Sequence, residues 1–211
     1  MVTLITGASS GIGEEFARRY AAKKHDLVLV ARRRDRLDSL AEELRDRDGV
    51  EVTVIPADLS EPDAAEHLWN ETSRMGLRVD VLVNNAGFGT GKDVVDDDPE
   101  RLEQEVRLNC LAVVGLTARY LPAMRERRGG TIINVSSAAA FQPMPHMAVY
   151  GATKAFVLSF TEALWRETGK DGIRVLAVCP GSTDTPFFEV SDEGTVVGRM
   201  RSTRQVLDTT M

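Results

Sequence analysis

The stretch VTLITGASSGIG, residues 2–13, joins a short apolar run to a turn that contains three glycines. A continuous run of Val, Leu and Ile is typical of a strand buried on both faces of a parallel sheet. Glycines allow a tight turn and let backbone N–H groups approach an anion, and the N-terminus of a following helix adds the positive end of its dipole. The stretch therefore predicts a strand, a phosphate-binding turn and a helix that together hold a dinucleotide. A purely structural glycine loop is the alternative interpretation.

Further apolar runs of the same kind recur along the chain, and segments with helical periodicity separate them. RDRLDSLAEELRDRDG, residues 34–49, has apolar residues three and four positions apart and ends in glycine, as a helix does. Strands that alternate with helices through right-handed crossovers predict an α/β protein with a doubly wound parallel sheet, the Rossmann fold. Because no repeat or linker divides the sequence, we expect a single domain over residues 1–211. The predicted strands are residues 2–6, 26–31, 51–57, 79–85, 131–137 and 173–180.

The composition is that of a soluble globular protein, with 43% hydrophobic and 27% charged residues. No apolar run approaches the roughly 18 residues of a membrane helix, and MVTLITG lacks the basic region of a signal peptide. The two cysteines are far apart, so we expect free thiols in the cytoplasm. A net charge of −6 disfavours nucleic acid as a partner, and the three histidines form no metal-binding pattern.

The end of the second predicted strand indicates which nicotinamide cofactor binds. An NAD site usually has an acidic residue there for the ribose 2′-hydroxyl, whereas an arginine suits the 2′-phosphate of NADP. Arg32 occupies this position, and Arg33 can add a second charge-assisted contact. The sequence therefore predicts NADP(H) rather than NAD(H). A solvated helix start is the alternative for Arg32, and Asp35 and Asp38, further along on the predicted helix, are the residues that could still favour NAD(H).

Tyr150 and Lys154, within VYGATKAF at residues 149–156, are four positions apart. This spacing places both side chains on one helix face, about one turn apart. Tyrosine has an ordinary pKa of ~10, and a nearby positive charge favours its ionised form. Such a pair can exchange a proton with a substrate oxygen, which is worth ~10²–10⁴ in rate. Any helix can carry the same pair without chemistry, so the spacing alone does not decide between the two interpretations.

Taken together, the motifs resemble the short-chain dehydrogenase/reductase family. They occur in the order and at the spacings of that family, with Ser137 13 residues before Tyr150, and the resemblance covers nearly the whole sequence. It implies an NAD(P)-dependent oxidoreductase that acts on a carbonyl/alcohol pair, with its catalytic segment at residues 131–190. The motifs that carry the resemblance are TGASSGIG at 6–13, NNAG at 84–87, Asn109, Ser137, YGATK at 150–154 and PGSTDT at 180–185.

The resemblance also implies the roles of four catalytic residues. Tyr150 would be the acid/base, and Ser137 would orient the substrate oxygen from the end of a strand. Lys154 would bind the nicotinamide ribose and lower the pKa of the tyrosine, and Asn109 would hold a proton-relay water. Two alternatives remain at this stage. Ser136 would replace Ser137 if the strand register slipped by one, and Asn109 would otherwise be a helix-interior polar residue with a local bond.

Cofactor contacts are implied along four segments. The glycine turn and the arginines would bind the phosphates, and Asp58 and Leu59 would flank the adenine. The NNAG motif would lie along the adenosine ribose, and the PG segment would hold the nicotinamide end. The cofactor-binding residues expected in this way are Gly7, Ser9, Ser10, Gly11, Ile12, Gly13, Arg32, Arg33, Asp58, Leu59, Asn85, Ala86, Gly87, Tyr150, Lys154, Pro180, Gly181, Thr183 and Thr185.

Two departures from the family pattern are visible. Ser10 stands where many NADP-preferring members have a basic residue, which leaves Arg32 and Arg33 to bind the 2′-phosphate. The sequence also lacks the last helix and strand that members usually have after the PG segment. The final stretch, residues 202–211, predicts a short helix capped by Ser202 or Thr203, and a helix this short and unpacked is marginal. We therefore expect the natural protein to extend beyond Met211, or its tail to be missing.

The expected partner is a small carbonyl or alcohol substrate. Apolar residues flank the predicted site and favour an apolar substrate of moderate size, although ordinary loop packing explains them equally well. His146 is expected to line the pocket or lie on the surface. Surplus apolar residues on the two long predicted helices, 99–128 and 150–169, predict a homodimer or homotetramer. Two other functions stay open: a non-catalytic NADP-binding regulatory or interaction protein, and a cofactor-cycling epimerase or dehydratase. The apolar residues near the site are Phe141, Met144, Met147, Phe187 and Phe188.

Overall fold

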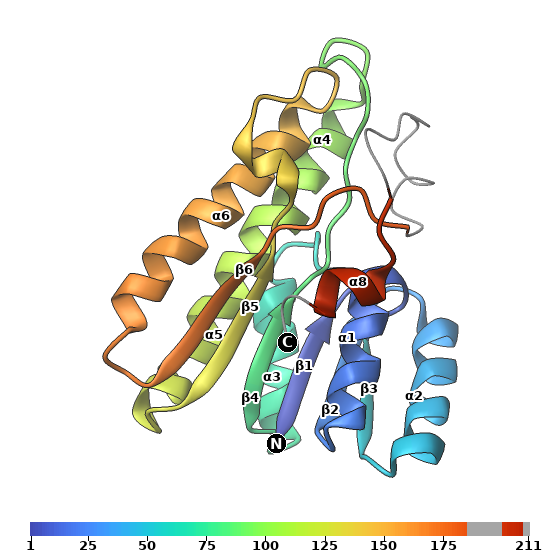
Figure 1. The fold of residues 1–211 in the computed structure, drawn as a ribbon, viewed down its shortest axis with the longest axis vertical. Helices are drawn as coiled ribbons and strands as arrows, with labels where there is room; N and C mark the ends of the chain where they lie inside the picture. Colours follow the sequence, from blue (N-terminus) through green and yellow to red (C-terminus); the bar gives the residue numbers. More distant parts are fainter. Residues whose placement is uncertain (185–199, 209–211) are drawn as a thin grey trace.

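A parallel β-sheet with strand order β3-β2-β1-β4-β5-β6 forms the centre of the molecule (Figure 1). The computed structural model describes residues 1–184 and 200–208. Each neighbouring pair of strands is parallel, and the strand order reverses next to β1. The predicted doubly wound α/β fold is thereby confirmed. The strands are β1 Val2–Thr6, β2 Asp26–Ala31, β3 Val52–Pro56, β4 Val79–Asn84, β5 Gly130–Val135 and β6 Ile173–Val178.

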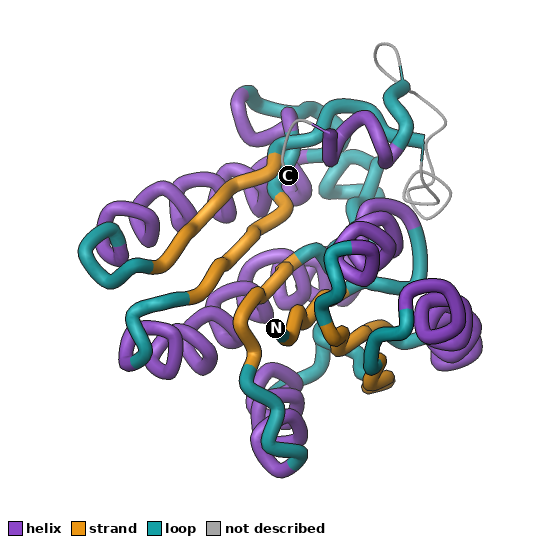
Figure 2. The backbone as a smooth tube through the Cα atoms, turned by 60° about the horizontal axis from the view of Figure 1, so that its bottom comes forward, coloured by secondary structure: helices purple, strands orange, loops and turns teal. Residues whose placement is uncertain are grey.

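Helices cover both faces of this sheet (Figure 2). One face packs against α1, α2 and α8 in a cluster that includes Phe16 and Leu44. The other face packs against α3, α5 and α6 in a cluster that includes Leu116 and Leu164. Burial on both faces explains why the strands have continuous rather than alternating apolar sequences. The helices are α1 Gly11–Ala22, α2 Arg34–Asp48, α3 Ala64–Arg74, α4 Pro99–Val106, α5 Ala112–Glu126, α6 Ala148–Thr168 and α8 Thr203–Asp208.

The long helix predicted from residue 99 to residue 128 is interrupted. A π-helical turn, η1 Arg107–Leu111, lies between α4 and α5, and the N–H of Ala112 bonds to the carbonyl of Arg107 five residues earlier. Turns of this type concentrate at functional sites because they redirect side chains and change the pairing of backbone carbonyls. Here the π turn contains Asn109, which is buried.

The fifth strand ends earlier than predicted. β5 stops at Val135, so Ser137 does not end a strand. Instead Ser137 caps the short 3₁₀ helix η2, Ala138–Phe141, and its Oγ accepts a 3.1 Å hydrogen bond from the N–H of Ala139. The serine side chain is therefore fixed by the turn that follows the strand, at the carboxyl edge of the sheet.

The expectation of an unpacked C-terminal helix is wrong. In α8, Val206 and Leu207 are buried and belong to the core cluster on the α1 face. Arg19 of α1 donates hydrogen bonds of 2.7 Å to the carbonyl of Arg204 and to the carboxylate of Asp208. The segment is short, but it is anchored to α1 by apolar contact and by charge. Among the described helices, none combines the length and hydropathy that a bilayer span requires.

Candidate active site

The glycine turn after β1 is packed too tightly for side chains. A Cβ atom on Gly7 would lie 2.7 Å from Nδ2 of Asn85, and one on Gly13 would lie 2.2 Å from the carbonyl of Gly7. Gly7 and Gly11 also have φ values of +67° and +61°, which L side chains rarely adopt. The turn leads directly into the N-terminus of α1, so backbone N–H groups and the helix dipole are both directed at this position. This arrangement suits a phosphate group.

Two arginines border the glycine turn. The guanidinium of Arg33 lies 3.3 Å from the hydroxyl of Ser9 and 3.2 Å from that of Ser10. Arg33 therefore supplies a positive charge at the point where Ser10 itself offers none. Arg32 follows β2, is 72% exposed, and pairs with Asp58 at 3.6 Å. Burial raises the pKa of Asp58, but hydrogen bonds from Ser60 and the charge of Arg32 outweigh it and lower the pKa overall.

Three other predicted cofactor residues have mainly structural contacts. The side-chain amide of Asn85 donates to the carbonyls of Thr6 and Gly7, at 2.9 and 3.3 Å, and so holds the glycine turn. Leu59 is buried in the cluster on the α3, α5 and α6 face of the sheet, and Ile12 packs against the cluster on the opposite face. Asp35 and Asp38 lie on α2, as predicted, and Asp38 pairs with Arg34. The Asn85 amide is therefore engaged in fixing the turn.

Asn109 joins the loop after β4 to α6. Its Oδ1 accepts a 3.2 Å bond from the N–H of Phe88, and its Nδ2 donates to the carbonyl of Phe88 at 2.8 Å. The same Nδ2 lies 3.0 Å from the hydroxyl of Thr153, which in turn donates to the carbonyl of Tyr150. A Cβ on Gly87 would approach Asn109 Oδ1 to 2.9 Å and Lys154 Nζ to 3.4 Å, so only glycine fits between them.

Tyr150, Lys154 and Ser137 lie together at the carboxyl edge of the sheet. Lys154 donates a 3.0 Å hydrogen bond to the carbonyl of Val135, and its ammonium lies 5.7 Å from the centre of the Tyr150 ring. Ser137 makes a side-chain hydrogen bond to Tyr150. The neighbouring Ser136 instead donates to the carbonyl of Lys154, at 2.7 Å, and is buried. In the observed strand register, Ser137 and not Ser136 is directed at Tyr150. Ser136 instead serves as an anchor to the backbone of Lys154.

Burial dominates the ionisation of the pair. It raises the pKa of Tyr150 to about 12 and lowers the pKa of Lys154 to about 8. The hydrogen bond from Ser137 lowers the pKa of Tyr150 but does not outweigh burial. Burial therefore outweighs the groups that favour the tyrosinate, and the lowering of the tyrosine pKa by the lysine stays a prediction. At neutral pH the tyrosine keeps its proton, and the larger part of Lys154 is an ammonium.

A buried carboxylate next to this pair was missed by the sequence analysis. Glu105 of α4 is fully buried, and burial raises its pKa to about 7. Its Oε2 accepts hydrogen bonds from the N–H and hydroxyl of Thr90, at 3.2 and 2.8 Å. A signal was present, because Glu105 precedes Asn109 by four positions and so shares its helix face.

The segment after β6 completes the edge of the site. The carbonyl of Pro180 accepts a 2.8 Å bond from the N–H of Ala138, which joins it to the Ser137 turn. Thr183 is buried, and its hydroxyl donates to the carbonyl of Gly181 at 2.9 Å. A β-bridge pairs Thr183 with Arg201. Thr185, Phe187 and Phe188, which the sequence assigns to the nicotinamide end and the substrate pocket, lie outside the described residues.

Two loops border the site at the carboxyl end of the strands, one after β4 and one before α6 (Figure 1). His146, with a φ of +65°, pairs with Asp93 at 2.8 Å and joins these two loops. It is exposed, in agreement with the surface interpretation. Val95 and Phe141 are exposed apolar side chains of the same two loops. The border of the site is thus partly apolar.

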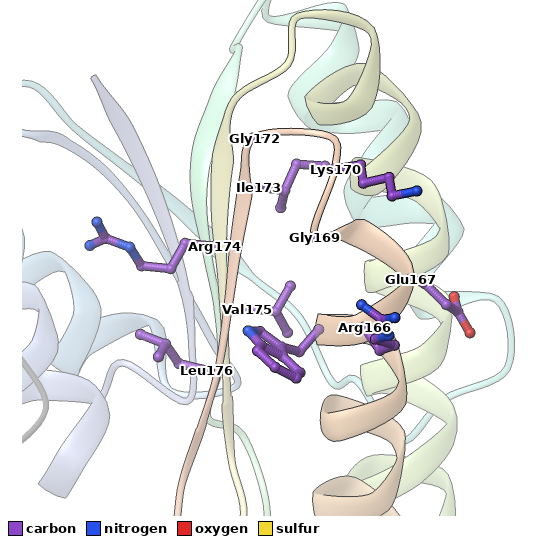
Figure 3. Close-up of a pocket in the computed structure, with 10 residues that line it drawn as sticks. Arg166, Glu167, Gly169, Lys170, Gly172, Ile173, Arg174, Val175 and Leu176 are labelled. Atoms are coloured by element: carbon purple, nitrogen blue, oxygen red, sulfur yellow. The ribbon is translucent and has the colours of Figure 1, made fainter.

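A groove of about 930 Å³ lies elsewhere, at the other end of α6 (Figure 3). It is lined by the last turn of α6, which includes Trp165, by the turn at Gly169–Gly172 and by the edge strand β6, with Val175 directed between helix and strand. None of the predicted site residues lines it. We therefore place the chemistry at the Tyr150 edge and not in this groove. In the described part of the chain, no cluster of His, Cys, Asp or Glu is suited to a metal ion.

A dinucleotide fits the residues that are present. The glycine turn, the N-terminus of α1 and the two arginines form a continuous cationic and N–H-rich edge beside β1, and Gly87 leaves space next to Lys154. This edge is the reversal point of the strand order, where ligands of doubly wound sheets bind.

Comparison with known proteins gives a consistent result. The family model described as short chain dehydrogenase matches residues 1–195. A sulfoacetaldehyde reductase from Chromohalobacter salexigens is 37% identical over 92% of this chain and 77% of its own length.

Two solved structures are closely similar. One is a short-chain dehydrogenase from Sphingobium yanoikuyae in complex with NADPH, with a TM-score of 0.93 and 38% identity over 99% of this chain and 82% of that chain. The other is an alcohol dehydrogenase from Comamonas testosteroni, specific for bulky-bulky ketones. It has a TM-score of 0.88 and 35% identity over 99% of this chain and 80% of that chain.

Proposed function

The chain belongs to the short chain dehydrogenase family, and from this premise we propose that it is an NADPH-dependent reductase that converts a carbonyl compound to an alcohol. The observation that carries the proposal is the convergence of three groups: the Tyr150 hydroxyl, the hydroxyl of Ser137 bonded to it, and the Lys154 ammonium 5.7 Å from its ring. A proton donor, an orienting hydroxyl and a fixed cation are the groups that reduction of a carbonyl requires.

We assign the binding of the cofactor to two parts of the site. The glycine turn and the N-terminus of α1 hold its phosphates, and Arg32 and Arg33 hold a 2′-phosphate. Lys154 and the Pro180–Thr183 segment hold the nicotinamide half, and Asn85, Ala86 and Gly87 lie along the adenosine ribose. When bound, the cofactor supplies the hydride, and the protein's own residues handle the proton. The NADPH complex of the structural neighbour from Sphingobium yanoikuyae supports the choice of NADPH.

Tyr150 gives its proton to the substrate oxygen as negative charge develops there. With a pKa of about 12, its hydroxyl is fully protonated at neutral pH, so the residue is ready to act as an acid. Ser137 donates a hydrogen bond that stabilises the tyrosinate once the proton has left. The charge of Lys154 acts in the same direction. Because the protonated tyrosine is the resting form, Tyr150 is in the protonation state that reduction of a carbonyl requires at neutral pH.

Asn109 holds this arrangement in place. It ties the backbone of Phe88 to α6 through Thr153, and so keeps the loop after β4 at a fixed distance from Tyr150. We assign it a further role, in which its π turn holds a water of a proton relay, through which the Tyr150 oxygen regains its proton from solvent by way of Lys154. The interruption of the helix at this residue supports that role.

The substrate class follows from the loops that border the site. Exposed Val95 and Phe141 give an apolar border, which suits a ketone or aldehyde with an apolar substituent. The Comamonas testosteroni neighbour is specific for bulky-bulky ketones, which supports a substrate with two sizeable substituents.

The direct test is a screen for carbonyl-dependent oxidation of NADPH, which is monitored by the loss of the absorbance of the reduced cofactor. Aldehydes, diketones and 3-ketoacyl thioesters form the panel of substrates. The Tyr150→Phe variant is the control that measures the background oxidation of NADPH. Stoichiometric consumption of NADPH with formation of an alcohol supports the proposal. Tight NADPH binding without turnover of any carbonyl indicates the non-catalytic alternative. Conversion of a substrate without net consumption indicates a cofactor-cycling epimerase or dehydratase.

A further inference from the structure

Glu105 is a buried ionisable group that takes no part in the steps of the proposed reaction. Its side chain is fully buried in α4, and its Oε1 has no hydrogen-bond partner among the described residues. Its Oε2 is held by the N–H and the hydroxyl of Thr90. An ionised carboxylate is costly to bury unless a positive charge or hydrogen bonds compensate it. A carboxylate with only one oxygen satisfied therefore points to a charge partner nearby.

The charged and titratable groups that face Glu105 come from each element packed around it. Glu105 precedes Asn109 by one helical turn, and a Cβ on Gly87 would lie 2.9 Å from Asn109 Oδ1 and 3.4 Å from Lys154 Nζ, so Glu105 and Lys154 border the same buried region. Electrostatic interactions connect Glu105 with Lys154 and Tyr150 of α6 and with Cys110 of η1. Asp97 acts on it from the loop before α4. Among the described residues that act on Glu105 electrostatically, Lys154 supplies the positive charge. The ammonium of Lys154 and the carboxylate of Glu105 carry opposite charges within the same buried region. Each charge therefore compensates the other.

Lys154 needs such a negative charge. The lysine is buried, and burial favours its neutral form. Cys110 and Cys179 would also raise its pKa if they were thiolates. Burial raises the pKa of Cys110 to about 11 and also raises that of Cys179, so both are uncharged thiols at neutral pH. Among the described residues that act on Lys154, Glu105 is the carboxylate, and it supplies negative charge as the pH rises through its pKa of about 7.

We propose that Glu105 is a positioning residue of the active site, which keeps the buried Lys154 in its ammonium form while Thr90 holds the carboxylate in place. The proposal rests on the proposed reductase function, in which the ammonium binds the cofactor ribose and stabilises the tyrosinate. Thr90 belongs to the loop that contains Gly87 and Phe88, so the same contact also fixes this loop to α4. The side chain of Glu105 thus determines both the charge of Lys154 and the position of the loop after β4.

The first experiment measures the protonation of Lys154 in the cofactor-free, full-length protein. The chain has only five lysines, so their side-chain signals can be resolved by NMR after isotope labelling of lysine, and Lys154→Arg identifies the signal. We expect Glu105→Gln to lower the titration midpoint of Lys154 by about one pH unit, as expected for loss of a nearby opposite charge. Glu103→Gln, an exposed carboxylate of the same helix, should leave the midpoint unchanged.

The second measurement is the pH profile of NADPH-dependent turnover. Glu105→Gln should move the alkaline loss of kcat/KM to lower pH by the same amount, and Glu105→Asp should restore part of the shift. Thr90→Val removes the 2.8 Å bond from the hydroxyl and so favours the uncharged carboxyl group. Like Glu105→Gln, this variant should lower the titration midpoint of Lys154. It provides the test of the proposal if Glu105→Gln fails to fold.

An unchanged Lys154 midpoint in Glu105→Gln, or in Thr90→Val where the first variant does not fold, would overturn the proposal and leave Glu105 as a structural contact. Absence of turnover in the wild type is a different outcome. It would count against the reductase function, whereas the NMR midpoint still decides whether Glu105 sets the charge of Lys154.

Discussion

The amide of Asn109 lies 3.0 Å from the hydroxyl of Thr153, and this contact joins the π turn to the helix that contains Tyr150 and Lys154. The same hydroxyl donates to the carbonyl of Tyr150, so one threonine fixes both residues. Both groups are buried, and the loss of a buried partner leaves a polar group without compensation.

Replacement of Thr153 by valine keeps the shape of the side chain and removes the hydroxyl. We expect the free energy of unfolding to fall by about 1–3 kcal/mol. We also expect kcat to fall roughly tenfold or more, because Asn109 and Tyr150 lose their common anchor. Urea unfolding and steady-state kinetics measure the two effects. Thr161→Val is the control, because its hydroxyl is buried two turns further along α6 and bonds to Asn134. It should lower stability and leave kcat unchanged; equal effects of the two variants on kcat would contradict the prediction.

Tyr150→Phe should abolish the proton donor while it keeps the ring in place. We expect turnover to fall by at least two orders of magnitude, and NADPH binding to change little. Tyr120→Phe is the matched control, because Tyr120 is also a buried tyrosine and its hydroxyl bonds to Thr72 at 2.8 Å. That variant should lose stability but keep its kcat. Stopped-flow turnover and fluorescence titration of NADPH give the two quantities, and activity of Tyr150→Phe within a few-fold of wild type would refute the assignment.

Glu105 should make the stability of the cofactor-free protein depend on pH. Its pKa is about 7 in the folded protein, above the ordinary value of 4.5. A group whose pKa is raised by folding contributes stability that is fully present below pH 4.5 and is lost as the pH rises through 7. Relative to Glu105→Gln, the wild type should therefore lose about 3 kcal/mol between these two pH values. Urea unfolding of both proteins across this range measures the difference. A constant difference would contradict the prediction, and Glu103→Gln should follow the wild type.

The assembly should be a homodimer or homotetramer, formed through the outer faces of α4, α5 and α6. Val106, Leu111, Phe156 and Trp165 are exposed there, which is unusual for side chains of this size. We expect light scattering of the full-length chain at micromolar concentration to give a dimer or larger species. Phe156→Asp combined with Leu111→Asp should give a monomer, whereas Val95→Asp, in the loop after β4, should not. A wild-type monomer would refute the prediction.

The elements of this fold that depend on local pattern were predictable from the sequence. The strands are buried on both faces, so their apolar runs were recognisable, and α2 ends at Gly49 in the left-handed conformation, as its glycine indicated. The strand ends were less certain, because the sequence TIINVSS continues smoothly beyond β5. Ser137 lies after the end of the strand and caps η2. Its position depends on the turn that follows β5 and not on the apolar run that forms the strand.

Features that depend on distant contacts were not predictable. The π turn at Asn109 accompanies its bonds to Phe88 and Thr153, which lie on other elements. The position of Glu105 one turn before Asn109 indicated a shared helix face, but its burial was not predictable, because it follows from the loop of Thr90 packing against it. The packing of Leu207 depends on α1, almost the full length of the chain away. In each case the sequence supplies the residue, and tertiary structure supplies its environment.

The preference between cofactors should depend on Arg32 and Arg33. Arg33 lies over the hydroxyls of Ser9 and Ser10, and Arg32 lies beside Asp58, so two positive charges border the glycine turn. A 2′-phosphate carries nearly two negative charges, and a charge-assisted hydrogen bond to it is worth ~1.5–3 kcal/mol. This corresponds to a roughly 10- to 150-fold preference for NADPH over NADH. Because Arg32 is largely exposed, we expect the lower half of that range and a decrease with added salt.

Replacement of Arg32 by aspartate should reverse this preference. The new carboxylate would repel the 2′-phosphate and offer an acceptor to the 2′-hydroxyl of NADH, and its position next to Asp58 would strengthen the repulsion. Arg33→Ala should reduce the preference without reversing it, because Arg32 remains. Arg34→Asp is the control, because Arg34 begins α2 and pairs with Asp38 away from the turn. The measurement is kcat/KM for both cofactors at two salt concentrations in all four proteins. If the wild type prefers NADH, or if Arg32→Asp and Arg34→Asp change the ratio equally, then Arg32 is only a solvated residue at the start of a helix, and the 2′-phosphate site must be sought elsewhere.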